Sequence, residues 1–351
     1  MVMRGGSSKG AYFVADDLPA DTTERDELLL RIMGSPDPRQ IDGIGGAHPL
    51  TSKVAIVGPS GRDDCDLEYL FLQLGVDEPL VSDRQNCGNL LAGVVPFAIE
   101  RDLVSVDAAE PARVSLRVLM RNTDSIATAL VYVADGRPTY AGGTAISGVP
   151  GTAAAVRLDF EGIAGSSCGA LLPTGNVVDT IGGVDCTLID NGMPVVVLRA
   201  DAVGVTGYES CAELEANREL RATLERLRIE AGIMMGLGQV QATTVPKMTM
   251  VALPGGRGDL CTRTFIPHRC HEAIGVLGAV SVATAALLPG SPAADLAAIH
   301  RPGTVVLEHP TGSFETSIDV RIDDGLPVVD RAGIVRTTRK LMDGVVFPRD
   351  Y

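Results

Sequence analysis

Short apolar runs separated by turn-forming residues dominate the pattern of hydrophobic and polar positions along the chain. The runs are rich in Val, Ile and Leu and are bounded by Gly, Pro, Asn or Asp, which is typical of strands. The regular alternation of strand and amphipathic helix that marks a doubly wound fold is missing. The pattern therefore predicts sheets of antiparallel or mixed character, with strands over residues 54–57, 114–120, 127–133, 156–160, 195–198, 305–307 and 318–322.

Two amphipathic helices are predicted on the surface. The first begins after a capping-box pattern at Asp21, carries apolar residues at helical spacing to Met33, and stops at Gly34-Ser35-Pro36. The second opens at Ser210 and is expected to end at Gly232. Its buried stripe consists of Leu214, Leu220, Leu224 and Leu227.

Residues 89–104 and 273–288 differ from the rest because they are apolar on nearly every helical face. Each follows a polar tetrad with one cysteine, Asn86-Cys87-Gly88-Asn89 in the first case and Arg269-Cys270-His271-Glu272 in the second. A helix that is apolar all round belongs inside a domain, and about 16 residues are too few to span a bilayer comfortably. We therefore expect one buried central helix in each half, wrapped by strands, as after an ancient duplication.

Length and charge narrow the classes of protein. A chain of 351 residues suggests two domains, and the turn-rich stretch 147–151 predicts domains over residues 1–150 and 151–332. The formal net charge is −14, from 30 basic and 44 acidic residues. Such a chain is a poor candidate for binding nucleic acid or an anionic membrane. No apolar run reaches the length of a membrane span.

The cysteines and the N-terminus indicate the cytoplasm. Seven cysteines at irregular spacing argue against a disulfide framework, and no apolar segment of a secretory signal opens the chain. No second pair of Cys or His ligands stands at zinc-like spacing from His268 and His271, so we expect no metal.

The tetrad around Cys87 is the strongest chemical signal. At the N-terminus of a buried helix, free backbone N–H groups can bind a carboxylate. The positive electrostatic field of the helix end also lowers the pKa of a thiol and so favours the thiolate. The alternative is an inert core cysteine, which is the commoner case. The flanking Asn and Gly residues favour the reactive interpretation, because an inert core cysteine needs no polar loop.

Two further segments carry candidate chemistry. Lys53 opens an apolar strand after the Gly-rich loop 41–49, and desolvation there would help it act as a base. A lysine that merely extends to solvent at a strand end is an equal alternative. Residues 4–10 combine two cations, two hydroxyls and three glycines, a set suited to an anion, although a flexible turn would look the same. The spacing of a Walker A loop is absent.

Six motifs run in one order across almost the whole chain, at residues 3–10, 42–46, 50–55, 86–89, 172–176 and 190–194. On these motifs the sequence resembles the PrpF-type isomerase family, within the diaminopimelate-epimerase-like superfamily. The resemblance implies an α+β fold of two pseudo-symmetric domains, each a strand-rich wrap around a buried central helix. It also implies that a C-terminal strand, about 333–351, returns to the first domain, and that the site lies in the cleft between the domains.

The family resemblance also implies an activity and a set of site residues. Residues 33–37, 88–94, 266–271 and 343–346 are similar to members that act on 4-oxalomesaconate. The implied reaction is a keto–enol tautomerisation of this tricarboxylate without a cofactor, with Lys53 and Cys87 as the acid/base groups. The second tetrad lacks the Gly-Ser-Gly context of the epimerases, which argues against Cys270 as a matching cysteine. The residues expected to contact the substrate are Arg4, Ser7, Ser8, Lys9, Ser52, Asn86, Gly88, Asn89, His268, Arg269 and His271.

Other functions stay open on the sequence. An allylic isomerase of the same substrate and a 2-methylaconitate cis–trans isomerase would carry the same motifs. A polycarboxylate-binding accessory protein is the alternative outside catalysis. A homodimer is the expectation at the level of the family.

Overall fold

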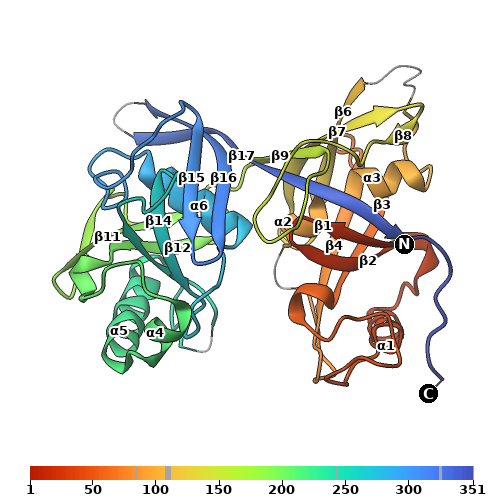
Figure 1. Cartoon of the computed structure of the whole chain (residues 1–351), viewed down its shortest axis with the longest axis horizontal. Coiled ribbons are helices and arrows are strands. Elements are labelled where there is room, and N and C mark those ends of the chain that lie inside the picture. Colours follow the sequence, from red (N-terminus) through yellow and green to blue (C-terminus); the bar gives the residue numbers. More distant parts are fainter. Residues whose placement is uncertain (84–85, 107–111, 242, 324–325, 351) are drawn as a thin grey trace. The chain divides into compact units, whose positions relative to one another are not determined.

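The computed structural model describes residues 1–83, 86–106, 112–241, 243–323 and 326–350, and the chain divides into two compact units (Figure 1). Unit 1 comprises residues 1–161 and 335–351, and unit 2 comprises residues 162–334. The boundary lies at residue 161 rather than at the expected 150. The reason is that β9 (Ala155–Glu161) pairs with β7 (Ser125–Ala134) and so completes the sheet of unit 1.

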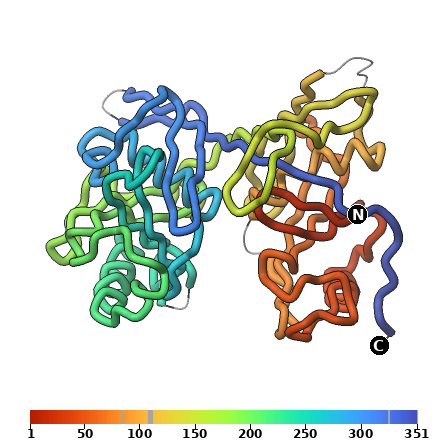
Figure 2. Tube along the Cα trace, viewed as in Figure 1, coloured from red at the N-terminus to blue at the C-terminus, as the bar shows by residue number. Residues whose placement is uncertain are grey.

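Unit 1 is built on a mixed sheet in which the end of the chain lies beside its beginning. Figure 2 shows the last strand, in blue, running along the first strands, in red. The pairs β2–β3 and β4–β6 are parallel, and the pairs β1–β17, β1–β2, β3–β4, β6–β7 and β7–β9 are antiparallel. In order of pairing the strands are β17 (Leu326–Met342), β1 (Val2–Gly5), β2 (Ser8–Val14), β3 (Lys53–Pro59), β4 (Leu67–Leu74), β6 (Ala112–Met120), β7 and β9. The short strand β5 (Val81–Ser82) pairs with β4, and the short strand β8 (Arg137–Pro138) pairs with β7.

Unit 2 repeats this topology. A hairpin, β11–β12, is followed by the parallel pair β12–β13, the antiparallel pair β13–β14, the parallel pair β14–β15 and the antiparallel pairs β15–β16 and β16–β17. The same order of pair types runs from β1 to β9 in unit 1, so β3 corresponds to β13. The strands are β10 (Asp179–Ile181), β11 (Val184–Asp190), β12 (Pro194–Arg199), β13 (Lys247–Ala252), β14 (Leu260–Phe265), β15 (Thr304–His309) and β16 (Gly312–Asp323). All seven predicted strands are confirmed.

The predicted central helix of unit 1 is two helices, which corrects the single helix expected over 89–104. These are α2 (Gly88–Leu91) and α3 (Val94–Glu100), and both are almost fully buried. Pro96 has no N–H to donate to the carbonyl of residue 92, so a continuous helix is interrupted there and restarts with Pro96 in its first turn. Gly93 sits at the break, where a Cβ would lie 2.5 Å from the Tyr12 hydroxyl.

The central helix of unit 2 is continuous but starts later than expected. It is α6 (Val276–Ala286), with Gly275 as its N-cap, and its residues are buried except for one partly buried position. It contacts β11, β12, β15 and β16. The expected start at residue 273 was wrong, and the second tetrad ends four residues before the helix begins.

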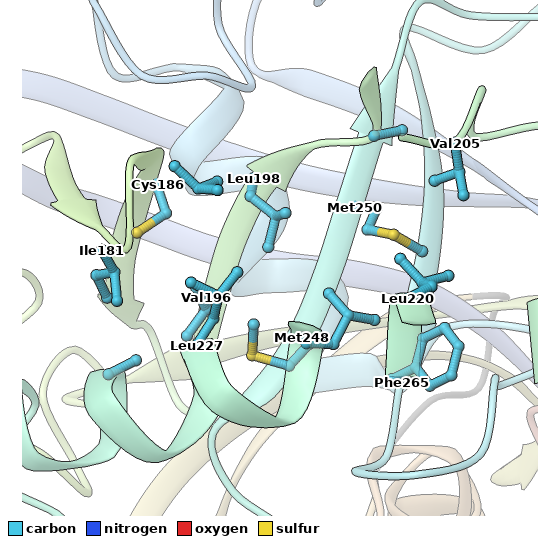
Figure 3. Close-up of a cluster of buried hydrophobic side chains, with 14 of the residues drawn as sticks. Ile181, Cys186, Val196, Leu198, Val205, Leu220, Leu227, Met248, Met250 and Phe265 are labelled. Atoms are coloured by element: carbon cyan, nitrogen blue, oxygen red, sulfur yellow. The ribbon is translucent and has the colours of Figure 1, made fainter. Parts of the chain in front are cut away.

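The surface helices cover the outer sides of the sheets. In unit 1, α1 (Thr22–Met33) is capped by the Asp21 carboxylate, and Gly34 at φ +80° ends it. In unit 2 the single predicted helix is α4 (Cys211–Ala216) and α5 (Arg218–Met234), and Gly232 lies inside α5 instead of ending it. Figure 3 shows how this layer packs, with leucines of α5 against methionines of β13. The chain also forms the short 3₁₀ helices η1 (Ala15–Asp17), η2 (Pro49–Thr51) and η3 (Asp201–Val203).

No helix in the described part of the chain combines the length and the apolar character needed to cross a bilayer.

Candidate active site

Cys87 occupies the N-cap of α2, as the tetrad predicted. Its carbonyl accepts the N–H of Leu91 at 3.0 Å and the hydroxyl of Tyr69 at 3.2 Å. The side chain is half-buried and the thiol is free. Because α2 is a single turn, the orientation of the local N–H groups matters more here than the dipole of a long helix.

The turn between β1 and β2 fits closely against the first turn of α2. Asn89 donates from Nδ2 to the Ser7 hydroxyl at 3.2 Å. A Cβ at Gly5 would lie 2.4 Å from the Asn89 carbonyl oxygen, and one at Gly6 would lie 2.1 Å from Asn89 Oδ1. Gly6 also has φ +52°, so two constraints require glycine there. The motif at 3–10 and the motif at 86–89 are therefore brought together, with Gly88 buried between them.

Asn86 anchors the loop that leads into Cys87. Its Nδ2 donates to the Thr123 hydroxyl at 2.6 Å, on the turn that follows β6. Its Oδ1 is buried and has no hydrogen-bond partner among the described residues. This oxygen is an acceptor beside the Cys87 backbone.

Lys53 is the first residue of β3 and is only 7% exposed. Its Nζ donates to Gln73 Oε1 at 2.7 Å and lies 4.9 Å from the centroid of the Phe71 ring. Gln73 is its direct cross-strand partner in β4. The ammonium is thus held by a neutral amide and an aromatic face, with no carboxylate in the set.

One face of β4 links the two candidate acid/base groups. Residues 69, 71 and 73 alternate along this strand and therefore share a face. Tyr69 contacts Cys87, while Phe71 and Gln73 contact Lys53. The contacts at residues 69 and 73 are about 13 Å apart along the strand, so the Cys87 backbone and the Lys53 ammonium lie on one side of the sheet.

Ser52 is fully buried and closes the loop that precedes Lys53. Its hydroxyl lies 2.8 Å from Gln40 Oε1 and 3.0 Å from the His48 carbonyl oxygen. Gln40 in turn accepts the N–H of Ala47 and donates to Ser35. The structure therefore places Ser52 in a network that fixes the loop and, through it, the start of β3.

Arg4 and Lys9 are not brought to the face that carries Lys53. Lys9 alternates with Ala11, which packs in the same cluster as the α1 residues Leu29 and Met33. Arg4 is the direct cross-strand partner of Lys9, so it shares that face. Both line a cavity of about 580 Å³ within unit 1, together with Ser7, Ser8 and Thr51.

In unit 2 the second tetrad is tied to α4. Arg269 Nε and the Cys270 N–H both donate to Glu215, each at 3.0 Å. Burial, followed by contact with the Cys211 thiol, raises the pKa of Cys270 well above its usual value. The two tetrads therefore share a cysteine in the second position and differ in structure.

The two histidines of this region differ in exposure. His268 is exposed, with Nδ1 3.7 Å from a carboxylate oxygen of Glu225. His271 is half-buried, and its Nδ1 accepts the N–H of Ala273 at 2.9 Å. Burial lowers the pKa of His271 below its usual value, which favours the neutral ring.

Lys247 was missed by the sequence reasoning. It is the first residue of β13, and burial, together with the nearby Arg228, lowers its pKa to about 8. A signal was present, because Lys247 precedes the apolar run 248–252 just as Lys53 precedes 54–57. In the described residues no three His, Cys, Asp or Glu side chains are grouped as metal ligands.

Comparisons with known proteins cover nearly the full length. The family model described as PrpF protein matches residues 1–349. The chain is 57% identical over 349 residues to a (4E)-oxalomesaconate Delta-isomerase of Novosphingobium sp. (strain KA1), covering 99% of this chain and 96% of that protein. It is 55% identical over 348 residues to a 4-oxalomesaconate tautomerase of Pseudomonas putida, covering 99% and 94%.

A solved structure supports the same assignment. The crystal structure of a methylitaconate-delta-isomerase superposes with a TM-score of 0.87 at 34% identity. The match covers 98% of this chain and 93% of that one. The expected fold of two pseudo-symmetric, strand-rich halves is thereby confirmed.

Proposed function

This chain belongs to the PrpF family, and from that premise we propose that it is an isomerase that moves protons on 4-oxalomesaconate without a cofactor. The observation that carries the proposal is that Lys53 and Cys87 both contact one face of β4. Lys53 contacts Phe71 and Gln73, and the Cys87 carbonyl contacts Tyr69. A proton transfer needs an acid and a base, and these two residues supply such a pair on one side of the sheet. Two relatives above 50% identity are named for this substrate.

The chemistry of the substrate fits a simple acid/base site. The keto form carries a methylene between a ketone and an alkene, and both groups acidify its C–H bonds. One group removes a proton from this carbon, and the electron pair spreads over the dienolate. Return of a proton to the oxygen gives the enol. Hydrogen-bond donors aimed at the dienolate oxygen lower the barrier, because the negative charge develops there.

In the proposed mechanism Lys53 and Cys87 share these two proton transfers. The Gln73 amide and the Phe71 face hold the Lys53 Nζ in place. The unpaired Asn86 Oδ1 and the Asn89–Ser7 contact form the polar surroundings of the thiol. His268, Arg269 and His271 of unit 2 are proposed to contact the substrate carboxylates.

The alternative outcome is an allylic isomerisation. It uses the same dienolate but returns the proton to the far carbon, so the double bond moves. The relative at 57% identity is named for an isomerase of this kind, and the relative at 55% is named a tautomerase. Identity therefore does not separate the two outcomes, and the site of reprotonation must be observed directly.

The test is proton NMR in deuterated buffer with 4-oxalomesaconate and catalytic protein. Rapid loss of the methylene signal with the enol as product supports the tautomerase. Deuterium at the former alkene carbon assigns the allylic isomerase instead. Tight binding with no exchange at any position would contradict catalysis and leave a polycarboxylate-binding protein.

Variants connect the activity to the site. Cys87→Ala is expected to lower the rate by about 10²–10⁴, the usual worth of an acid/base group. Cys211→Ala is the matched control, because that cysteine is also half-buried and free but lies in α4. Equal rates in the two variants would remove Cys87 from the mechanism.

We further propose that the protein works in the cytoplasm as a homodimer. All seven cysteines are free, which suits a reducing compartment. Light scattering coupled to size exclusion measures the assembly, and a monomer at working concentration would refute the dimer.

A further inference from the structure

The cavity of about 580 Å³ in unit 1 is lined by three cations and by no carboxylate. The cations are Arg4, Lys9 and Arg339. This composition is unexpected in a chain whose net charge is −14. Anionic ligands are attracted into clefts lined by the opposite charge, so the local field here opposes that of the whole protein.

The three cations form a row across neighbouring strands. Arg4 in β1 is the direct partner of Lys9 in β2 and of Arg339 in β17. Direct cross-strand partners project from the same face of a sheet. The spacing between strands makes the row about 10 Å long from end to end. Thr337 and Leu341, which alternate with Arg339, line the same cavity.

This row of cations costs stability in the free protein. Like charges directly opposite one another on adjacent strands are destabilising. None of the three forms an ion pair with a carboxylate of the described residues. Burial and the Arg339 charge both lower the pKa of Arg4 below its usual value. Only Nη1 of Arg4 is engaged by the described residues, with Gly6 and Thr337, which leaves a ligand access to Nε and Nη2.

Ser8, the first residue of β2, borders the cavity but does not face the row of cations. It alternates with Lys9 and is the direct partner of Gly5, so its side chain projects to the opposite face of the sheet. A Cβ at Gly5 would lie 3.0 Å from Leu90, which places that face against α2. The case for a ligand in the cavity therefore rests on the three cations.

The row lies on the sheet face opposite to Lys53. Lys340, next to Arg339 in β17, reaches Glu100 of α3 at 2.6 Å, so residue 339 projects to the side away from the central helices. Lys53 instead faces Phe71, on the side of those helices. The cavity approaches the proposed acid/base pair at the β1–β2 turn, through Ser7, and at Thr51, two residues before Lys53.

We propose that this cavity is a second ligand site, which binds a polycarboxylate along the row Lys9–Arg4–Arg339. A row of about 10 Å suits two or three carboxylates spread along a carbon chain, whereas a single phosphate would engage two of the cations. Arg339 supplies a planar fork for a bidentate contact. The site stands independently of the proposed reaction.

The test is calorimetric titration with tricarballylate, a tricarboxylate without the reactive ketone and alkene. The wild type and Lys53→Met are both expected to bind it at this site. Arg339→Gln is expected to weaken that binding about tenfold, the worth of one charge-assisted contact, and Arg339→Lys by less. The matched control is Arg257→Gln, since Arg257 is an exposed arginine of unit 2 that does not line the cavity. Arg339→Gln should also unfold at or above the wild-type temperature, because the repulsion is relieved.

Three results would overturn the proposal. One is equal tricarballylate affinity in the wild type and Arg339→Gln. Another is inorganic phosphate binding as tightly as tricarballylate, which would make this a single-anion site. The third is loss of all tricarballylate binding in Lys53→Met, which would merge the cavity with the reaction site. Absence of turnover with 4-oxalomesaconate would instead refute the proposed function and leave this site standing.

Discussion

Strands β3 and β13 occupy equivalent places in the two units, and each begins with a lysine. Both strands pair in parallel with the second strand of a hairpin and antiparallel with the strand that follows. Lys53 donates to Gln73 and lies over Phe71, whereas Lys247 has no hydrogen-bond partner among the described residues. The repeated backbone therefore preserves the position of a cation but not its surroundings.

The central helices differ in the same way. The N-cap of α2 is Cys87, and the N-cap of α6 is Gly275. Cys270 is the cysteine of the second tetrad, but its N–H binds Glu215 and its thiol is buried away from the helix end. Among the described residues, a lysine with a hydrogen-bonded amide partner and a cysteine at a helix start occur together in unit 1 and not in unit 2. A duplicated fold fixes where backbone groups lie, and the proposed acid/base pair belongs to one copy.

The largest effect is expected from replacing the two lysines. Lys53→Met should lower the rate of turnover about 10²–10⁴-fold, because it removes a positioned acid/base group. Lys247→Met should lower it less than about tenfold, since Lys247 has no thiol at the neighbouring helix start. Rates from the NMR assay with 4-oxalomesaconate measure both variants. A loss in Lys247→Met that equals the loss in Lys53→Met would mean that both copies take part in the reaction.

The two hairpin turns give the next largest effect. Gly6 and Gly192 both have positive φ, +52° and +86°, so alanine costs about 1–2 kcal/mol of strain at either position. At Gly6 the added Cβ also meets Asn89 Oδ1 at 2.1 Å, while at Gly192 it meets only Ile163 and Leu277 carbons at 3.2 Å. Gly6→Ala is therefore expected to destabilise by about 1 kcal/mol more than Gly192→Ala.

Denaturant unfolding measures this difference, and Gly61→Ala, which meets no atom within 4 Å, is the control. Gly6→Ala should also lower turnover, because the collision displaces the first turn of α2 that positions Cys87. Full activity in a folded Gly6→Ala protein would show that the contact between this turn and α2 is dispensable.

The local pattern of the sequence was enough to predict most elements and the positions of Lys53 and Cys87 in them. Period-two and apolar runs located the strands, and the positions of Lys53 at a strand start and Cys87 at a helix start follow from neighbours within a few residues. The break at Gly93 was missed, although Pro96 signalled it. The unit boundary was missed because it depends on β9 pairing with β7, a contact that no local pattern encodes.

The grouping of the site residues needed tertiary information. Arg4 and Lys9 share a short motif with Ser7 and Ser8, so the sequence predicted that all four contact the substrate beside Lys53. The register of β1, β2 and β17 puts the two cations on the other face, beside Arg339. Arg339 lies more than 300 residues from Arg4 in sequence, and its contribution appears only when the chain returns to unit 1.

The last prediction concerns the surroundings of Lys247 and the dependence of stability on pH. The pKa of Lys247 is about 8 in the folded chain, and an ordinary lysine has a pKa of about 10.4. Below pH 8 both states hold the proton, so stability does not change with pH through this group. Between about pH 8 and 10.4 the folded chain has released a proton that the unfolded chain keeps, so the free energy of unfolding rises with pH, by at most about 1.4 kcal/mol per pH unit.

In Lys247→Met this rise is expected to be absent. Urea unfolding of both proteins at several pH values from 7.5 to 10.5 measures the difference. Parallel profiles would show that Lys247 is as well solvated as an ordinary lysine, and the contrast with Lys53 would then rest on hydrogen bonding alone.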